Sequence, residues 1–120
     1  MNVLITGGSR GIGAAAVRAF SARGDRVAFF YEKEDEKAAA VAAETGAQAV
    51  RCDVADEARV TDALSAIPDV DVLINNAGIA HYALINQITP EQWHRIFAVH
   101  VDGAFYCIRA ALPHMLRQQS

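Results

Sequence analysis

Eight consecutive residues near the start of the chain have the types and spacing of a phosphate-binding loop. They are Thr6, Gly7, Gly8, Ser9, Arg10, Gly11, Ile12 and Gly13. Gly7 permits a tight turn, Gly11 lets a phosphate approach the backbone, and Gly13 allows close packing of a helix on a strand. A helix that follows such a loop directs its positive end at an anion. The loop therefore predicts dinucleotide binding, with a plain strand-to-helix turn as the alternative.

Two later groups of residues end apolar runs. Asn75-Asn76-Ala77-Gly78 ends one run, and the pair Asp53-Val54 ends another. In an open parallel sheet the carboxyl ends of the strands lie along one edge, where ligands bind. We therefore expect the two asparagines to reach the ligand, with a plain turn as the alternative. Asp53 taken alone could be a helix-capping residue.

The segments that must position these residues alternate between strand and helix patterns. Strands are expected at Met1–Thr6, Val27–Tyr31, Gln48–Cys52 and Val70–Asn75, and helices at Gly11–Ala22, from the charged stretch Glu32–Lys37 to Gly46, at Asp56–Ile67, and from Thr89-Pro90-Glu91 almost to the chain end. Gly103 and Pro113 predict a bend or break in the last helix. The alternation predicts an α/β fold with a doubly wound parallel sheet and helices on both faces.

Composition limits the classes of protein to consider. The 120 residues are 52% hydrophobic, which suits one core and a single domain over 1–120. The net charge of −3 argues against a nucleic-acid partner. Apolar runs of five or six residues fall short of a membrane span, and no secretory signal is visible, so we expect a cytoplasmic protein. Cys52 and Cys107 lie far apart in the sequence and are expected to be reduced thiols.

The ordered groups Thr6 to Gly13, Asp53-Val54 and Asn75 to Gly78 resemble the short-chain dehydrogenase/reductase family, in particular members that reduce 3-oxoacyl groups on acyl carrier protein. The resemblance covers essentially the whole chain. It implies a Rossmann-like sheet and an NAD(P)-dependent oxidoreductase. Such an enzyme transfers hydride between nicotinamide and a carbonyl or alcohol substrate, which is a small molecule or an acyl carried on its carrier protein.

The resemblance also assigns roles to residues of the cofactor site. It implies that Gly7 to Arg10 and Ile12 line the phosphates and ribose. Asp53, with Val54 beside it, would meet the adenine amino group. Asn76, Ala77 and Gly78 would lie by the cofactor ribose.

The choice between the two nicotinamide cofactors depends on the end of the second strand. An acidic residue there would bind both ribose hydroxyls and repel a 2′-phosphate, but Tyr31 aligns with this position and Glu32 follows it. Arg10 and Lys33 could pair with a phosphate. NADP(H) is therefore favoured, and NAD(H) remains possible.

The catalytic serine and the Tyr-x-x-x-Lys pair of the family are absent from these 120 residues, in which Lys37 is the last lysine. We therefore expect the cofactor-binding half of a longer enzyme, truncated after the long helix that follows the fourth strand. Alone it should be inactive, because no positioned group can transfer the proton. The rival interpretation is a non-catalytic nucleotide-binding module or an inactive fragment.

His100 stands where the resemblance places a catalytic asparagine that anchors a water. An imidazole can hold a water but titrates near neutral pH, so a structural role is the alternative. His81, His94 and His114 show no ligand spacing with it, and no metal is expected.

The resemblance further implies a homo-oligomer that pairs through the long helix. Four strands in the family order 3-2-1-4 would also leave the fourth strand at an uncovered edge. Large apolar residues of the long helix face a second subunit, the chain's own sheet, or both on different faces of the helix; they include Trp93, Phe97, Phe105 and Ile108.

Overall fold

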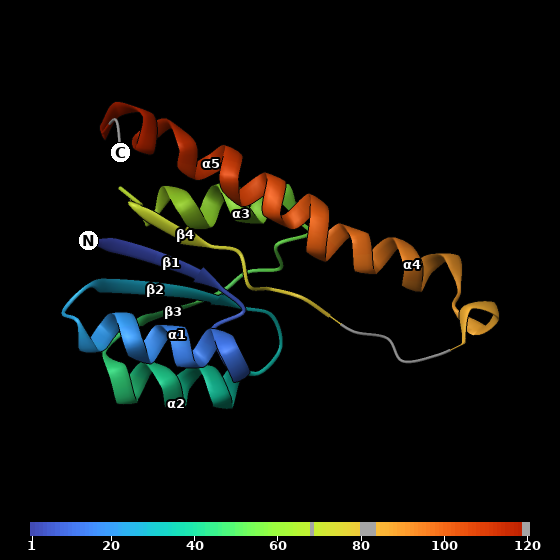
Figure 1. Ribbon diagram of the computed structural model, residues 1–120, viewed down its shortest axis with the longest axis horizontal. Helices are drawn as coiled ribbons and strands as arrows, with labels where there is room; N and C mark the ends of the chain where they lie inside the picture. Colours follow the sequence, from blue (N-terminus) through green and yellow to red (C-terminus); the bar gives the residue numbers. More distant parts are fainter. Residues whose placement is uncertain (68, 80–83, 119–120) are drawn as a thin grey trace.

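The computed structural model describes residues 1–67, 69–79 and 84–118, and its centre is a four-stranded sheet in the order β3-β2-β1-β4 (Figure 1). The strands are β1 (Asn2–Thr6), β2 (Arg26–Tyr31), β3 (Gln48–Arg51) and β4 (Val72–Ile74). All three strand pairs are parallel. The predicted parallel sheet and its strand order are confirmed.

Helices cover both faces of this sheet. On one face lie α1 (Gly11–Ala22) and α2 (Asp35–Thr45), and on the other lie α3 (Glu57–Ser65) and α5 (Gly103–Gln118) (Figure 1). Each face has its own apolar core, one built around Val3, Ile5 and Phe29 and the other around Leu4 and Phe30. Successive strand side chains point to opposite faces and both faces are covered, which explains the unbroken apolar runs of β1 and β2.

Several element boundaries differ from the predicted ones by one or two residues. β3 ends one residue before Cys52, and β4 is limited to Val72–Ile74. α3 begins after Asp56, whose side chain accepts a hydrogen bond from the backbone N–H of Arg59 at 3.3 Å and so caps the helix. Capping hydrogen bonds of this kind help to decide where a helix begins, and the pattern of apolar residues does not predict them.

Both cysteines lie in the core between the sheet and α5. Cys52 and Cys107 are buried and free, so the prediction of reduced thiols is confirmed. Burial raises the pKa of Cys52 to about 11 and that of Cys107 to about 12. Both thiols are therefore neutral at physiological pH.

A long helical segment crosses the end of the sheet. A 3-10 turn η1 (Ile85–Gln87) precedes α4 (Pro90–Phe97), which a π-helical segment η2 (Ala98–Asp102) joins to α5. Thr89 and Gln92 form the two hydrogen bonds of a capping box, with proline at the helix start as predicted.

The two interruptions predicted in this helix have different outcomes. The π-helical segment lies directly before Gly103, so the interruption there is confirmed. A Cβ at Gly103 would lie 2.6 Å from Cγ2 of Val54, which shows that the helix needs glycine for close packing. The break expected at Pro113 is absent, because α5 continues to Gln118. Pro113 is exposed, and water can satisfy the carbonyl that lacks its helical partner.

The same segment corrects the exclusion of membrane spans that was based on short apolar runs. Residues Pro90–Gln118 form 29 helical residues whose most apolar stretch has a mean hydropathy of 1.2, enough in length and composition to cross a membrane. A core helix of a soluble protein passes the same test, so this is weak evidence for a membrane.

Candidate nucleotide-binding site

The carboxyl ends of the four strands border one groove of about 510 Å³. The segments after β1, β2, β3 and β4 all contribute to its lining, together with Val99 of the π-helical segment. The predicted residues that it brings together are Gly7, Ser9, Arg10, Gly11, Ile12, Tyr31, Asp53, Val54, Asn76, Ala77 and Gly78. Thr6, Gly8 and Gly13 do not line the groove, since all three are buried.

Thr6 fastens the end of β1 to the segment after β4. Its side-chain oxygen accepts hydrogen bonds from the backbone N–H groups of Asn76 at 3.0 Å and Ala77 at 2.9 Å, and the residue is 1% exposed. Thr6 therefore shapes the groove through the protein's own backbone. The amide of Asn76 adds a second link by donating to the carbonyl oxygen of Gly7 at 3.1 Å.

Close packing explains two of the loop glycines. A Cβ at Gly13 would overlap the carbonyl oxygen of Gly7, so only glycine lets the first turn of α1 lie against the loop. A Cβ at Gly8 would lie 2.5 Å from Cβ of Phe29 on the neighbouring strand. The backbone N–H groups of Gly7 and Gly8 both donate to the carbonyl oxygen of Phe30, which fixes the turn out of β1.

The start of α1 is open toward the groove. Gly11 has a φ of +57°, and a Cβ built there would meet no atom within 4 Å. Arg10 is the N-cap residue and makes no side-chain capping bond, so the first N–H groups of α1 have no side-chain acceptor at the cap. A left-handed glycine with free space beside uncapped N–H groups is a cradle that a phosphate would fit.

Charged side chains surround the part of the groove beyond β2 and β3. Arg10 pairs with Glu34 at 3.1 Å, and Lys37 approaches the same carboxylate at 3.6 Å. Glu32 and Asp53 both pair with Arg95 of α4. Asp53 also accepts a hydrogen bond from the backbone N–H of Ala55, while Asp56 is the residue that caps α3, so the capping alternative for Asp53 is wrong.

His100 lies next to the groove, in a hollow of about 150 Å³ that Thr6 and Asn75 also line. Its Nε2 is 3.0 Å from the backbone nitrogen and 2.7 Å from the carbonyl oxygen of Ile79. A Cβ at Gly78 would lie 2.5 Å from Cε1 of the ring. His100 is therefore in contact with the segment after β4, and π-helical turns such as the one that carries it are frequent at functional sites.

The family model for short chain dehydrogenase matches residues 1–120. The chain belongs to the short-chain dehydrogenase/reductase family. It is 40% identical to acetoacetyl-CoA reductase of Rhizobium meliloti in an alignment of 106 positions that covers 85% of this chain and 44% of that protein. It is 36% identical to the 3-oxoacyl-(acyl-carrier-protein) reductase FabG of Staphylococcus aureus in an alignment of 128 positions, gaps included, that covers 99% of this chain and 52% of that protein.

Solved structures of the family agree with the fold. A short chain dehydrogenase from Burkholderia cenocepacia in complex with NADP matches with a TM-score of 0.87 and 36% identity, over 94% of this chain and 50% of that one. Two further similar structures, 37% and 36% identical, are complexes with NADPH. The chain spans about half the length of these relatives.

Arg95 is the residue of this short-chain dehydrogenase/reductase chain that sequence reasoning missed. It is 42 and 63 positions away from its two partners, so no local pattern joins them. The sequence marks it only as an arginine on the long helix predicted from Thr89-Pro90-Glu91 onward. Among the described residues no group of three or more His, Cys, Asp and Glu is arranged to hold a metal, and His81 lies outside those residues.

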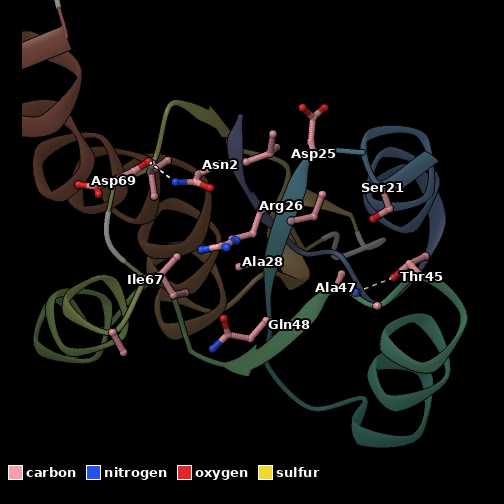
Figure 2. A pocket seen from close by; sticks show the side chains of 15 residues that line it. Asn2, Ser21, Asp25, Arg26, Ala28, Thr45, Ala47, Gln48, Ile67 and Asp69 are labelled. Carbon is pink, nitrogen blue, oxygen red and sulfur yellow. Dashed lines mark hydrogen bonds between the residues drawn. The ribbon is translucent and has the colours of Figure 1, made fainter. Parts of the chain in front are cut away.

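A second cavity of about 410 Å³ lies at the opposite, amino-terminal ends of the strands, as Figure 2 shows. Arg26 of β2 and Gln48 of β3 are among the side chains that line it, while the carboxylate of Asp25 points away from them. Ligands of doubly wound sheets bind at the carboxyl ends of the strands. We therefore place the functional site of this short-chain dehydrogenase/reductase chain in the groove beside the glycine loop.

Proposed function

We propose that the chain binds NADP(H) in the groove at the strand carboxyl ends and forms the cofactor-binding part of a short-chain oxidoreductase. The observation that carries this proposal is the start of α1, where Gly11 leaves free space beside uncapped N–H groups. Complexes of three similar structures with NADP or NADPH support the same cofactor. The absence of an acidic residue at Tyr31 agrees with this preference, and Arg10 and Lys33 supply positive charge nearby.

The residues of the groove have distinct tasks in this proposal. Gly7, Ser9, Arg10 and Ile12 line the groove and would hold the phosphates and ribose, while the buried Gly8 shapes the loop. Asp53 with Val54 would meet the adenine. Asn76, Ala77 and Gly78 would lie by the cofactor ribose, on a segment that Thr6 fixes.

When bound, the nicotinamide supplies or accepts a hydride at the substrate carbon. We assign to these 120 residues the binding and orientation of the cofactor. Proton transfer at the substrate oxygen is not assigned to them, because the sequence contains no Tyr-x-x-x-Lys. His100 is proposed to position the segment at Gly78 and Ile79 through its ring contact.

The proposed substrate is a carbonyl or alcohol of the 3-oxoacyl type, either a small molecule or an acyl group on a carrier. The names of two relatives, acetoacetyl-CoA reductase and 3-oxoacyl-(acyl-carrier-protein) reductase, support this class. The proposed location is the cytoplasm, where such substrates and NADP(H) are available.

A non-catalytic nucleotide-binding module is the second candidate. The specific observation that favours it is His100 at the family's asparagine position. Both candidates predict cofactor binding, and both predict that these 120 residues alone are inactive. Hydride transfer to a 3-oxoacyl substrate by the full-length polypeptide therefore separates them.

Calorimetric titrations of the protein with NADPH and with NADH test the proposed cofactor site. Gly11→Ala and Gly46→Ala form a matched pair, since both glycines have positive φ and both would place a Cβ in open space. Each substitution should cost about 1 kcal/mol of stability because alanine is strained at positive φ.

Only Gly11→Ala should weaken NADPH binding, because its methyl group enters the space assigned to the phosphates. Equal affinities of the two variants would contradict the proposed placement of the phosphates. Absence of binding by the unsubstituted protein would contradict the cofactor site as a whole.

A further inference from the structure

One arginine bridges two carboxylates that line the groove. Nη2 of Arg95 lies 2.8 Å from Oε1 of Glu32, and Nη1 lies 3.0 Å from Oδ2 of Asp53. The three side chains come from different elements, namely α4 and the segments after β2 and β3. Each side chain is about one-third exposed, at 35% to 36%.

The contacts of these residues fix the geometry of the bridge. Asp53 is held by the backbone N–H of Ala55 at 3.0 Å on its other oxygen, so it presents Oδ2 to the guanidinium. The hydrogen bond to Asp53 raises the pKa of Arg95, which keeps the guanidinium charged. Each of the two carboxylates lines the groove, and Val99, one helical turn after Arg95, lines it as well.

The three side chains lie near the proposed position of the adenosine ribose, which is where NADP(H) carries the 2′-phosphate that NAD(H) lacks. The end of β2 faces the adenosine ribose of a dinucleotide, and the 2′-phosphate of NADP(H) adds a charge of about −2 there. Glu32 beside that position would repel the phosphate. A guanidinium that holds Glu32 neutralises part of this repulsion and offers planar donors suited to phosphate.

We propose that Arg95 is a specificity-determining residue that adapts this groove to the 2′-phosphate by neutralising Glu32 and Asp53. The inference rests on the proposed NADP(H) site and adds the residue that sets the preference between the two cofactors. Two other cations near this end, Arg10 and Lys37, both face Glu34, and Lys33 also lines the groove. Arg95 is the residue that pairs with both Glu32 and Asp53, so its removal would leave both carboxylates without this partner.

The test compares dissociation constants of NADPH and NADH for the protein and its Arg95 variants, by calorimetry at fixed ionic strength. Arg95→Gln removes the charge and should lower the preference for NADPH over NADH by about fivefold, the scale of a partly exposed charge pair. Arg95→Lys keeps the charge and should retain most of the preference. Arg18→Ala removes a charge and an ion pair with Glu44 outside the groove, and should leave the preference unchanged.

A second substitution tests whether Arg95 acts on the cofactor preference by neutralising Glu32. Glu32→Gln alone should raise the preference for NADPH, and Glu32→Gln in the Arg95→Gln background should recover most of the lost preference. The measured quantity is a ratio of two affinities. A structural change that weakens the binding of both cofactors equally therefore leaves this ratio unchanged. If Arg95→Gln fails to fold, Glu32→Gln still decides, since an unchanged preference there overturns the inference.

The failure of the inference is distinguishable from the failure of the proposed function. Binding of neither cofactor by the unsubstituted protein would overturn the NADP(H) site itself. Binding of NADPH with a preference that Arg95→Gln leaves unchanged would overturn only the role of Arg95.

Discussion

At the scale of single residues, the two buried thiols make stability depend on alkaline pH. A cysteine in an unfolded chain has a pKa near 8.5, whereas burial raises the pKa of Cys52 to about 11 and that of Cys107 to about 12. Above pH 8.5 unfolding therefore releases protons, so the stability contributed by the neutral thiols is full below this pH and is lost as pH rises toward 11 to 12.

Urea unfolding at pH 7.5, 9 and 10 measures this dependence. The free energy of unfolding should fall over this range, and it should fall less steeply in the Cys52→Ala/Cys107→Ala variant, which carries neither thiol. Equal slopes for the two proteins would show that other groups cause the alkaline loss.

Residue types together with the family resemblance predicted most of the residues that line the groove. Gly7, Asn76 and Asp53 come together because each lies within two residues of the end of a strand, and the ends of parallel strands share one edge. Arg95 could not be found in this way, because its position depends on where α4 lies relative to the segments after β2 and β3. The inward turn of Thr6 likewise follows from its burial, which the loop motif does not encode.

At the scale of elements, the packing of the long helix on the end of β3 depends on Gly103. A Cβ there would lie 2.6 Å from Cγ2 and 3.2 Å from the carbonyl oxygen of Val54. Gly103→Ala should gain up to about 1 kcal/mol of helix propensity but lose about 1–3 kcal/mol through overpacking, so we expect net destabilisation.

A double-mutant cycle with Val54→Ala checks this packing argument by denaturant unfolding. Removing the Val54 side chain makes room for the new methyl group, so the double variant should be more stable than the sum of the single effects predicts. Additive effects would show that the helix can move away from Val54 without cost.

The elements themselves were predictable because the strands and helices have regular apolar patterns and α4 has a strong start signal. Thr89 and Pro90 predicted the start of α4, and the structure has the complete capping box. The π-helical segment was not predictable, since one extra residue in a helical turn leaves no distinct pattern in Ala98–Asp102. We attribute the π-helical segment to the packing of the long helix against the segment after β4, which His100 contacts at Ile79.

At the scale of the whole molecule, the long helix carries an apolar stripe that faces away from the sheet. The stripe consists of Trp93, Phe97, Val101, Phe105, Ile108, Leu112 and Leu116, whose exposed fractions are 42% to 66%. These positions recur every three or four residues and so lie along one side of the helix. The alternative that they face the chain's own sheet is therefore wrong. We propose a second copy of the chain as their partner, in line with the homo-oligomer that the family resemblance implies.

Sedimentation velocity at several protein concentrations tests this homo-oligomer. The unsubstituted protein should sediment as a dimer or larger species, because an exposed apolar stripe of this length is costly in water. Phe97→Asp and Phe105→Asp should each shift the protein toward the monomer, since a charge in the centre of such an interface is left without a partner. Ile12→Asp is the matched control: Ile12 is 81% exposed but lies in the groove, so this variant should keep the mass of the unsubstituted protein. A monomer at all concentrations, or the same loss of mass in all three variants, would contradict an interface centred on Phe97 and Phe105.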